Sequence, residues 1–169
     1  MEKEAVFSLF FLSLGGIYLT LDEYYMGLAL RQAELAARLG EVPVGAVLVR
    51  KGRILAVAHN RRELDKSALA HAEILAIAAG CREAGGWRLF DSSLYVTLEP
   101  CPMCAGAILN ARIDRVVYAA PDPKAGSLAS MMEMYQYPYN HSPKVMGGLL
   151  AEESAKLLRD FFQTLRKNK

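Results

Sequence analysis

Residues 93–111 read SLYVTLEPCPMCAGAILNA and determine the fold class. Residues 93–98 are rich in aromatic, β-branched and other apolar residues, which predicts a β-strand. The run 102–111 is rich in alanine and other apolar residues, and it begins with proline, which suits the first turn of a helix. A strand that passes directly into a helix is half of a βα unit, so we expect a sheet that helices cover.

The same kind of pattern extends in both directions. Residues 42–49 and 53–58 are two β-rich runs around the turn Arg50-Lys51-Gly52, which predicts a hairpin. Further strands are predicted at 115–119 and 144–146, and helices at 22–39, 71–82, 127–135 and 152–167. A hairpin followed by βα units predicts an α/β fold with a mixed sheet, for which we expect five strands.

Length and composition limit the function classes. The chain has 169 residues, of which 53% are apolar and 22% charged, as in a globular protein of one domain. A net charge of +2 excludes a polybasic protein but leaves a local nucleic-acid-binding patch open. Three cysteines, an odd number, argue against a secreted disulfide scaffold. Metal or redox chemistry is the better expectation for the pair Cys101 and Cys104.

The N-terminal 21 residues differ from the rest, because residues 5–21 carry no charge. A membrane anchor, a packed extension and translation from a start codon upstream of the working domain are three interpretations of this apolar leader. The stretch is short for a membrane span, which needs about 20 apolar residues, and Gly15-Gly16 interrupts it. We favour the upstream start and assign the working domain to residues 22–169.

Two predicted helix starts carry the chemistry. One begins at His71-Ala72-Glu73, and the other contains Cys101 and Cys104, which lie on one face of a helical turn. One imidazole and two thiolates give zinc three protein ligands and leave a fourth position open for water, as a catalytic site requires. Glu73 is then placed to transfer protons without binding the metal.

Two other interpretations of these cysteines are weaker. A closed structural site that also uses Cys81 is unfavourable, because ten helical residues separate it from His71 by about 15 Å. Cys81 is better explained as a small buried residue. A redox Cys-x-x-Cys pair leaves both His71 and Glu73 without a role.

The motifs resemble those of a known family. His-x-Glu followed by Pro-Cys-x-x-Cys is the signature of the zinc-dependent base deaminases. Further matching motifs fall in order along residues 22–169: 41–46, Asn60, 70–73, 94–107, Arg112-Ile113, Asp122-Pro123-Lys124, Asn140-His141 and Phe161-Phe162. With them the chain resembles bacterial tRNA-specific adenosine deaminases, in the cytidine/deoxycytidylate deaminase superfamily.

This resemblance implies a function. It implies a three-layer α/β/α fold and hydrolytic deamination of adenosine to inosine at the wobble position of a tRNA anticodon. It also implies a cytoplasmic homodimer with shared active sites, one Zn²⁺ per subunit and no stable membrane association. The implied zinc ligands are His71, Cys101 and Cys104, with Glu73 as proton shuttle, and the implied substrate contacts are Asn60, Val44, Asp122, Lys124 and Phe162.

Alternatives remain open at this point. Ser67-Ala68-Leu69 and Pro121 depart from the family pattern on the side that faces RNA. His-Ala-Glu with Pro-Cys-Pro-Met-Cys also resembles deaminases of a free base or nucleoside such as guanine. A non-catalytic zinc-binding module is the alternative from another class, and Glu73 argues against it. By residue type alone, a turn explains Asn60 better than a substrate contact does, and Asp122, between two prolines, also suits a turn.

Overall fold

The computed structural model describes residues 12–14 and 17–167. Its main body is a five-stranded sheet in the order β4-β3-β5-β6-β7. The strands are β3 (Gly45–Arg50), β4 (Arg53–His59), β5 (Ser92–Leu98), β6 (Arg115–Ala120) and β7 (Lys144–Gly147). Strand β3 is antiparallel to β4 and β5, whereas β5, β6 and β7 are parallel. The predicted hairpin and the mixed sheet are therefore confirmed.

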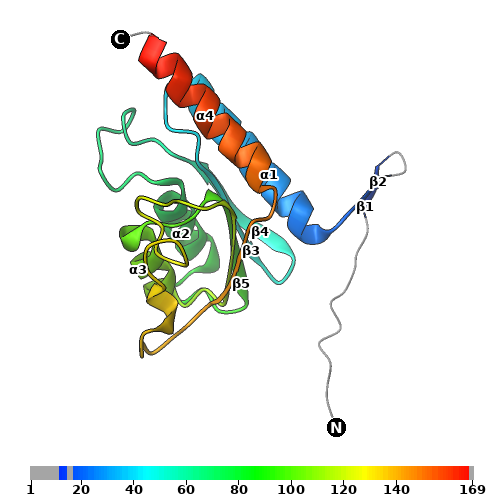
Figure 1. The fold of residues 1–169 in the computed structure, drawn as a ribbon. Coiled ribbons are helices and arrows are strands. Elements are labelled where there is room, and N and C mark those ends of the chain that lie inside the picture. The colour runs from blue at the N-terminus through cyan, green and yellow to red at the C-terminus, as the bar shows by residue number, and fades with distance from the viewer. Residues whose placement is uncertain (1–11, 15–16, 168–169) are drawn as a thin grey trace.

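Two pairs of helices cover the two faces of the sheet (Figure 1). The helices are α1 (Leu21–Arg38), α2 (Ala72–Ala84), α3 (Pro102–Ala111) and α4 (Ala151–Lys167). Successive side chains of β3 point to opposite faces of the sheet. Leu48 packs in one core cluster with α2 and α3, and Val47 packs in another with α1. The three-layer α/β/α arrangement is confirmed.

Helix α1 starts one residue before the predicted position, and its start is well defined. Thr20 is the N-cap, and its side chain accepts a hydrogen bond from the backbone of Glu23, whose carboxylate accepts from the backbone of Thr20. This reciprocal capping box satisfies two backbone donors at the helix end. Helix α1 then packs so closely on β3 that a Cβ at Gly45 would clash with its backbone.

The predicted helix over 127–135 is wrong. The structure has turns there and one short 3-10 helix, Met134–Gln136. The backbone N–H groups of residues 128–130 donate to the buried carboxylate of Glu99, so the segment wraps around that side chain. Local composition favoured a helix, and this tertiary contact overrides it.

Most of the apolar leader, residues 1–11 and 15–16, lies outside the described residues. The described part contains a short antiparallel pair, β1 (Leu12–Leu14) and β2 (Ile17–Leu19), which precedes α1 (Figure 1). None of the helices that the structure describes combines the length and the apolar character that crossing a membrane requires.

Candidate active site

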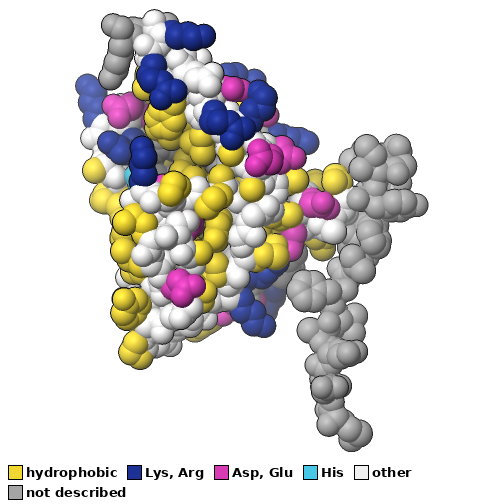
Figure 2. Space-filling model, in the orientation of Figure 1, with side chains coloured by type: hydrophobic (Ala, Val, Ile, Leu, Met, Phe, Trp, Pro, Cys, Tyr) yellow, Lys and Arg dark blue, Asp and Glu magenta, His cyan; other side chains and the backbone are white. Residues whose placement is uncertain are grey.

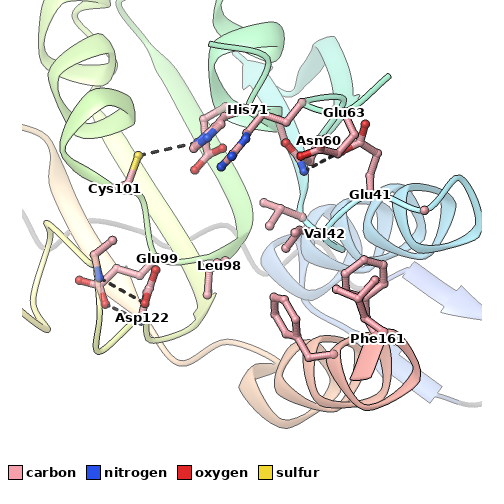
Figure 3. Close-up of a pocket in the computed structure, with 18 residues that line it drawn as sticks. Glu41, Val42, Asn60, Glu63, His71, Leu98, Glu99, Cys101, Asp122 and Phe161 are labelled. Carbon is pink, nitrogen blue, oxygen red and sulfur yellow. Dashed lines mark hydrogen bonds between the residues drawn. The ribbon is translucent and has the colours of Figure 1, made fainter. Parts of the chain in front are cut away.

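A cavity of about 410 Å³ lies at the carboxyl ends of the parallel strands β5 and β6. This is the usual position of a ligand site in an open α/β sheet. The start of α2 and Cys101, the residue just before α3, form its floor, and α4 forms the opposite side, where Phe161 lies across the cavity from His71 (Figure 3). The cavity therefore gathers segments that are far apart in the sequence.

His71 and Cys101 line the floor of this cavity, and the side chain of Cys104 is buried beside them. His71 and Cys101 are the N-cap residues of α2 and α3, and Cys104 lies in the first turn of α3. Nδ1 of His71 lies 3.7 Å from Sγ of Cys101 and 3.6 Å from Sγ of Cys104, and all three ligand atoms lie within 4.8 Å of one another. Figure 3 shows the imidazole turned toward Cys101.

These donors fit a tetrahedral metal ion. Zinc binds nitrogen at about 2.0–2.1 Å and sulfur at about 2.3 Å, so tetrahedral neighbours lie about 3.6 Å apart. In the protein alone, the hydrogen bond from Cys104 lowers the pKa of Cys101 to about 4. The pKa of Cys104 is raised by its hydrogen bond with Cys101 and by burial. Two thiols and an imidazole held this close share protons that a cation would displace.

Glu73 lies beside this group in the first turn of α2 and is only 4% exposed. Burial raises the pKa of its carboxyl to about 7. Its Oε2 atom is buried and has no hydrogen-bond partner among the described residues. A carboxylate with a pKa near neutrality and a free oxygen that borders the cavity suits general acid–base catalysis.

Asn60 and Val44 form the wall next to α1. Asn60 is 6% exposed, and its Nδ2 atom donates to Oε2 of Glu41 at 3.2 Å (Figure 3). Glu41 is 1% exposed and also accepts from the backbone N–H of Leu64 at 2.7 Å. Because a carboxylate only accepts, this bond fixes the orientation of the Asn60 amide and directs its Oδ1 away from Glu41.

The other predicted contact residues occupy two places. Asp122 borders the cavity, but its Oδ1 accepts from the backbone N–H groups of Lys124 and Ala125, so it also closes a turn. Lys124 lies outside the cavity, in an adjoining groove of about 660 Å³ that shares Phe162 with it. Arg159 and Arg166 line the same groove. Figure 2 shows Lys and Arg side chains gathered around this end of the molecule.

Sequence reasoning missed Glu41 and Glu99 as site residues. Each carboxylate is 1% exposed and holds a loop on one side of the cavity. The available signal was a charged residue next to an apolar strand and close to a proline, at Glu41-Val42-Pro43 and Leu98-Glu99-Pro100. Cys81 lies outside the metal-binding cluster, with its Sγ atom 3.7 Å from the carbonyl oxygen of Trp87.

Comparisons with known proteins agree with this geometry. A family model described as MafB19-like deaminase matches residues 21–166. The tRNA-specific adenosine deaminase of Bacillus subtilis (strain 168) is 49% identical over 152 residues, which cover 89% of this chain and 94% of that protein. A solved structure from studies of A-to-I editing by tRNA:A34 deaminases at the wobble position of transfer RNA is 46% identical, with a TM-score of 0.78. That match covers 80% of this chain and 99% of the other.

A guanine deaminase is also similar, though less so. The structure of guanine deaminase from Bacillus subtilis is 32% identical, with a TM-score of 0.59. That match covers 86% of this chain and 93% of the guanine deaminase chain. Both measures are lower than those of the tRNA:A34 deaminase structure.

Proposed function

The chain belongs to the MafB19-like deaminase family and, within it, to the tRNA-specific adenosine deaminases, and on that premise we propose that it deaminates adenosine to inosine at the wobble position of a tRNA anticodon. The reaction consumes one water and releases one ammonia. The observation that carries the proposal is the convergence of His71, Cys101 and Cys104 beside buried Glu73, in a chain 49% identical to a tRNA-specific adenosine deaminase.

We propose Zn²⁺, one per subunit, as the metal that His71, Cys101 and Cys104 hold. Two thiolates and one imidazole are a donor set that zinc prefers, and three protein ligands leave one coordination position open. When bound, zinc supplies the Lewis acidity that makes water a nucleophile near neutral pH.

Glu73 is the proposed proton carrier. Its free Oε2 atom takes the two protons of the attacking water one after the other; it passes the first to a nitrogen of the purine ring and the second to the departing amine, which leaves as ammonia. In the protein without a bound metal, the pKa of this carboxyl is about 7, a range in which a group can both accept and give up a proton at neutral pH. Burial beside the cavity causes this raised pKa, so the protein environment that receives the base also sets the pKa of Glu73.

Asn60, Val44, Asp122, Lys124 and Phe162 are the proposed substrate contacts. Asn60 and Val44 meet the flipped nucleotide inside the cavity, where an extruded base requires hydrogen bonds and an apolar wall. Lys124 and Phe162, with Arg159 and Arg166, line the adjoining groove. Basic and aromatic side chains together suit phosphates and unstacked bases of the flanking nucleotides.

We also propose a cytoplasmic homodimer. The chain exposes several large apolar side chains at positions away from the cavity, including Leu69 (62% exposed), Met131 (58%) and Tyr137 (59%). Where such side chains form a contiguous patch, they are typical of a surface that binds another protein. A sedimentation measurement that gives the mass of a single chain would contradict this proposal.

The discriminating experiment compares an anticodon stem-loop that has adenosine at the wobble position with free guanine and free adenosine. We expect inosine in the stem-loop, and little product from either small molecule, because contacts to flanking nucleotides supply the positioning. Binding of the stem-loop should weaken as salt rises, since phosphate contacts release counterions. Equal turnover of free guanine would favour the guanine deaminase alternative instead.

A further inference from the structure

Glu99 is a buried carboxylate that the proposed reaction does not use. It follows β5 and directly precedes Pro100 and Cys101, and it is 1% exposed. Among the described residues no salt bridge reaches it. A buried charge is costly unless hydrogen bonds satisfy it, so its partners explain why it is tolerated.

The hydrogen-bond donors that the structure gives to the Glu99 carboxylate all lie in one loop, residues 122–130. Oε1 accepts from the backbone N–H groups of Leu128 (3.1 Å), Ala129 (2.7 Å) and Ser130 (2.9 Å). Oε2 accepts from the backbone N–H of Asp122 (3.0 Å) and from the hydroxyl of Ser130. Figure 3 shows Glu99 and Asp122 side by side. One side chain therefore binds both ends of this loop.

The loop is shaped around the carboxylate. A Cβ at Gly126 would clash with the carboxylate of Glu99 and would lie 2.6 Å from the carbonyl oxygen of Asp122. The backbone N–H of Ser127 donates to the carbonyl oxygen of Pro100 at 2.9 Å. The loop thus closes on the segment that carries the first cysteine of the metal-binding cluster.

The same loop borders both the cavity and the adjoining groove, where the proposed function places the substrate. Asp122 and Ala125 border the cavity, and Pro123 and Lys124 border the adjoining groove. Without an acceptor at position 99, backbone N–H groups of this loop would be left without partners, each at a cost comparable to a lost hydrogen bond. The loop would then leave its present conformation, and the contacts of Asp122 and Lys124 would move with it.

We propose that Glu99 is a positioning residue for RNA binding, which holds the 122–130 loop in the shape that receives the nucleotides around the target base. This inference rests on the proposed function. Glu99 borders the cavity, but it is only 1% exposed and both of its carboxylate oxygens accept hydrogen bonds from the loop, so it acts through the loop. It links the backbone next to Cys101 to the substrate wall, so that the metal site and the RNA-binding surface keep a fixed relative position.

Glu99→Gln tests the proposal with little change of shape. If the amide oxygen takes the place of Oε1, the NH₂ group faces the N–H of Asp122, and two donors cannot pair. We expect KM for the stem-loop to rise about tenfold or more, the size expected for one lost hydrogen bond to a charged group. The value of kcat should stay within about threefold, because Glu73 and the ligand set are unchanged. Zinc content should stay that of the unmodified protein.

Glu83→Gln is the matched control, because that carboxylate is exposed and pairs with Arg53, outside the lining of the cavity. It should leave KM and zinc content unchanged. Gly126→Ala tests the loop from the other side: the carboxylate stays, but the added Cβ disturbs the turn, and KM should rise as in Glu99→Gln. This second variant decides the question if Glu99→Gln does not fold.

Hydrogen exchange separates this proposal from the proposed function, because it needs no substrate. The amides of Asp122 and of residues 128–130 should be protected in the unmodified protein, and the Asp122 amide should lose protection in Glu99→Gln. A folded Glu99→Gln protein with unchanged KM, or with lower kcat alone, would overturn the positioning role. An unmodified protein that leaves the stem-loop unchanged would instead refute the proposed function, whatever the exchange measurement gives.

Discussion

The guanidinium of Arg115 donates hydrogen bonds to both carboxylate oxygens of Asp22, at 2.8 Å and 2.6 Å. The hydroxyl of Tyr95 donates to the same carboxylate at 2.6 Å. These contacts join the first turn of α1 to β5 and β6 across 93 residues of sequence. Both charged side chains are 23% exposed, so water screens this pair less than it screens a surface pair.

Asp22→Asn should lower the free energy of unfolding at pH 7 by about 1–2 kcal/mol, allowing for the partial exposure. The hydrogen bond from Arg115 lowers the pKa of Asp22 below its ordinary value of 3.8. The stabilisation is therefore present above pH 3.8 and is lost as pH falls through the lower folded-state value. Urea unfolding of both proteins at pH 7 and near pH 3 should show the difference shrinking in acid.

Asp160→Asn is the control for this prediction. Its pair with Lys156 is largely exposed, at 55% and 71%. Such a pair contributes little, so the expected change is below about 0.5 kcal/mol. An equal effect of the two substitutions would show that burial of the Asp22 pair has no energetic consequence.

Glu73→Gln should retain the metal and lose deamination. The amide fills the same buried space but cannot accept and return a proton, and positioned general acid–base groups contribute about 10²–10⁴-fold in rate. Metal analysis and inosine formation on the stem-loop are the two measurements. A Glu73→Gln protein with near-normal turnover would exclude the proposed proton carrier.

Cys104→Ser should lose metal and stability together. The thiolate is one of three ligands, and metal binding is coupled to folding because the unfolded chain has no preformed site. Cys81→Ser is the matched control, since Cys81 lies outside the metal-binding cluster. Metal content and melting temperature of both variants give the test. Full metal content in Cys104→Ser would remove Cys104 from the proposed ligand set.

Much of the fold was predictable, because the spacing of apolar residues within a segment indicates a strand or a helix when that segment packs on the core through one face. The helix 102–111 matched at both ends, since Pro102 marks its start. The segment 127–135 did not match, because its conformation depends on a carboxylate 28 or more residues earlier in the sequence. Residue spacing predicted the grouping of His71, Cys101 and Cys104, which the structure brings together.

The supporting residues could not be predicted from pattern. Glu41 and Glu99 act by accepting from backbone N–H groups, and every residue except proline offers that donor, so no sequence motif identifies the partners. The orientation of Asn60 depends on Glu41, 19 residues away. Only the folded chain shows these pairings.

Removal of the apolar leader should leave the domain intact as long as the capping box of α1 is kept. Deletion of residues 2–18 retains Thr20 and hence the hydrogen bonds with Glu23 that begin α1. Deletion through Thr20 removes them, at a cost of about 0.5–2 kcal/mol. We therefore expect the shorter deletion to keep the melting temperature, and the longer one to melt a few degrees lower.

Both truncated proteins should remain soluble, bind metal and deaminate the stem-loop, because among the described residues those of the metal cluster and the cavity all lie at or after Gly40. Solubility, melting temperature and inosine formation, measured beside the full chain, test this. Thr20→Ala in the full chain is the control, since it removes the cap and leaves residues 1–19 in place. If removal of residues 2–18 lowers the melting temperature more than Thr20→Ala does, the leader stabilises the domain and is a packed extension. If the full chain sediments with membranes and is active there, while the truncated protein does not sediment, the leader is an anchor.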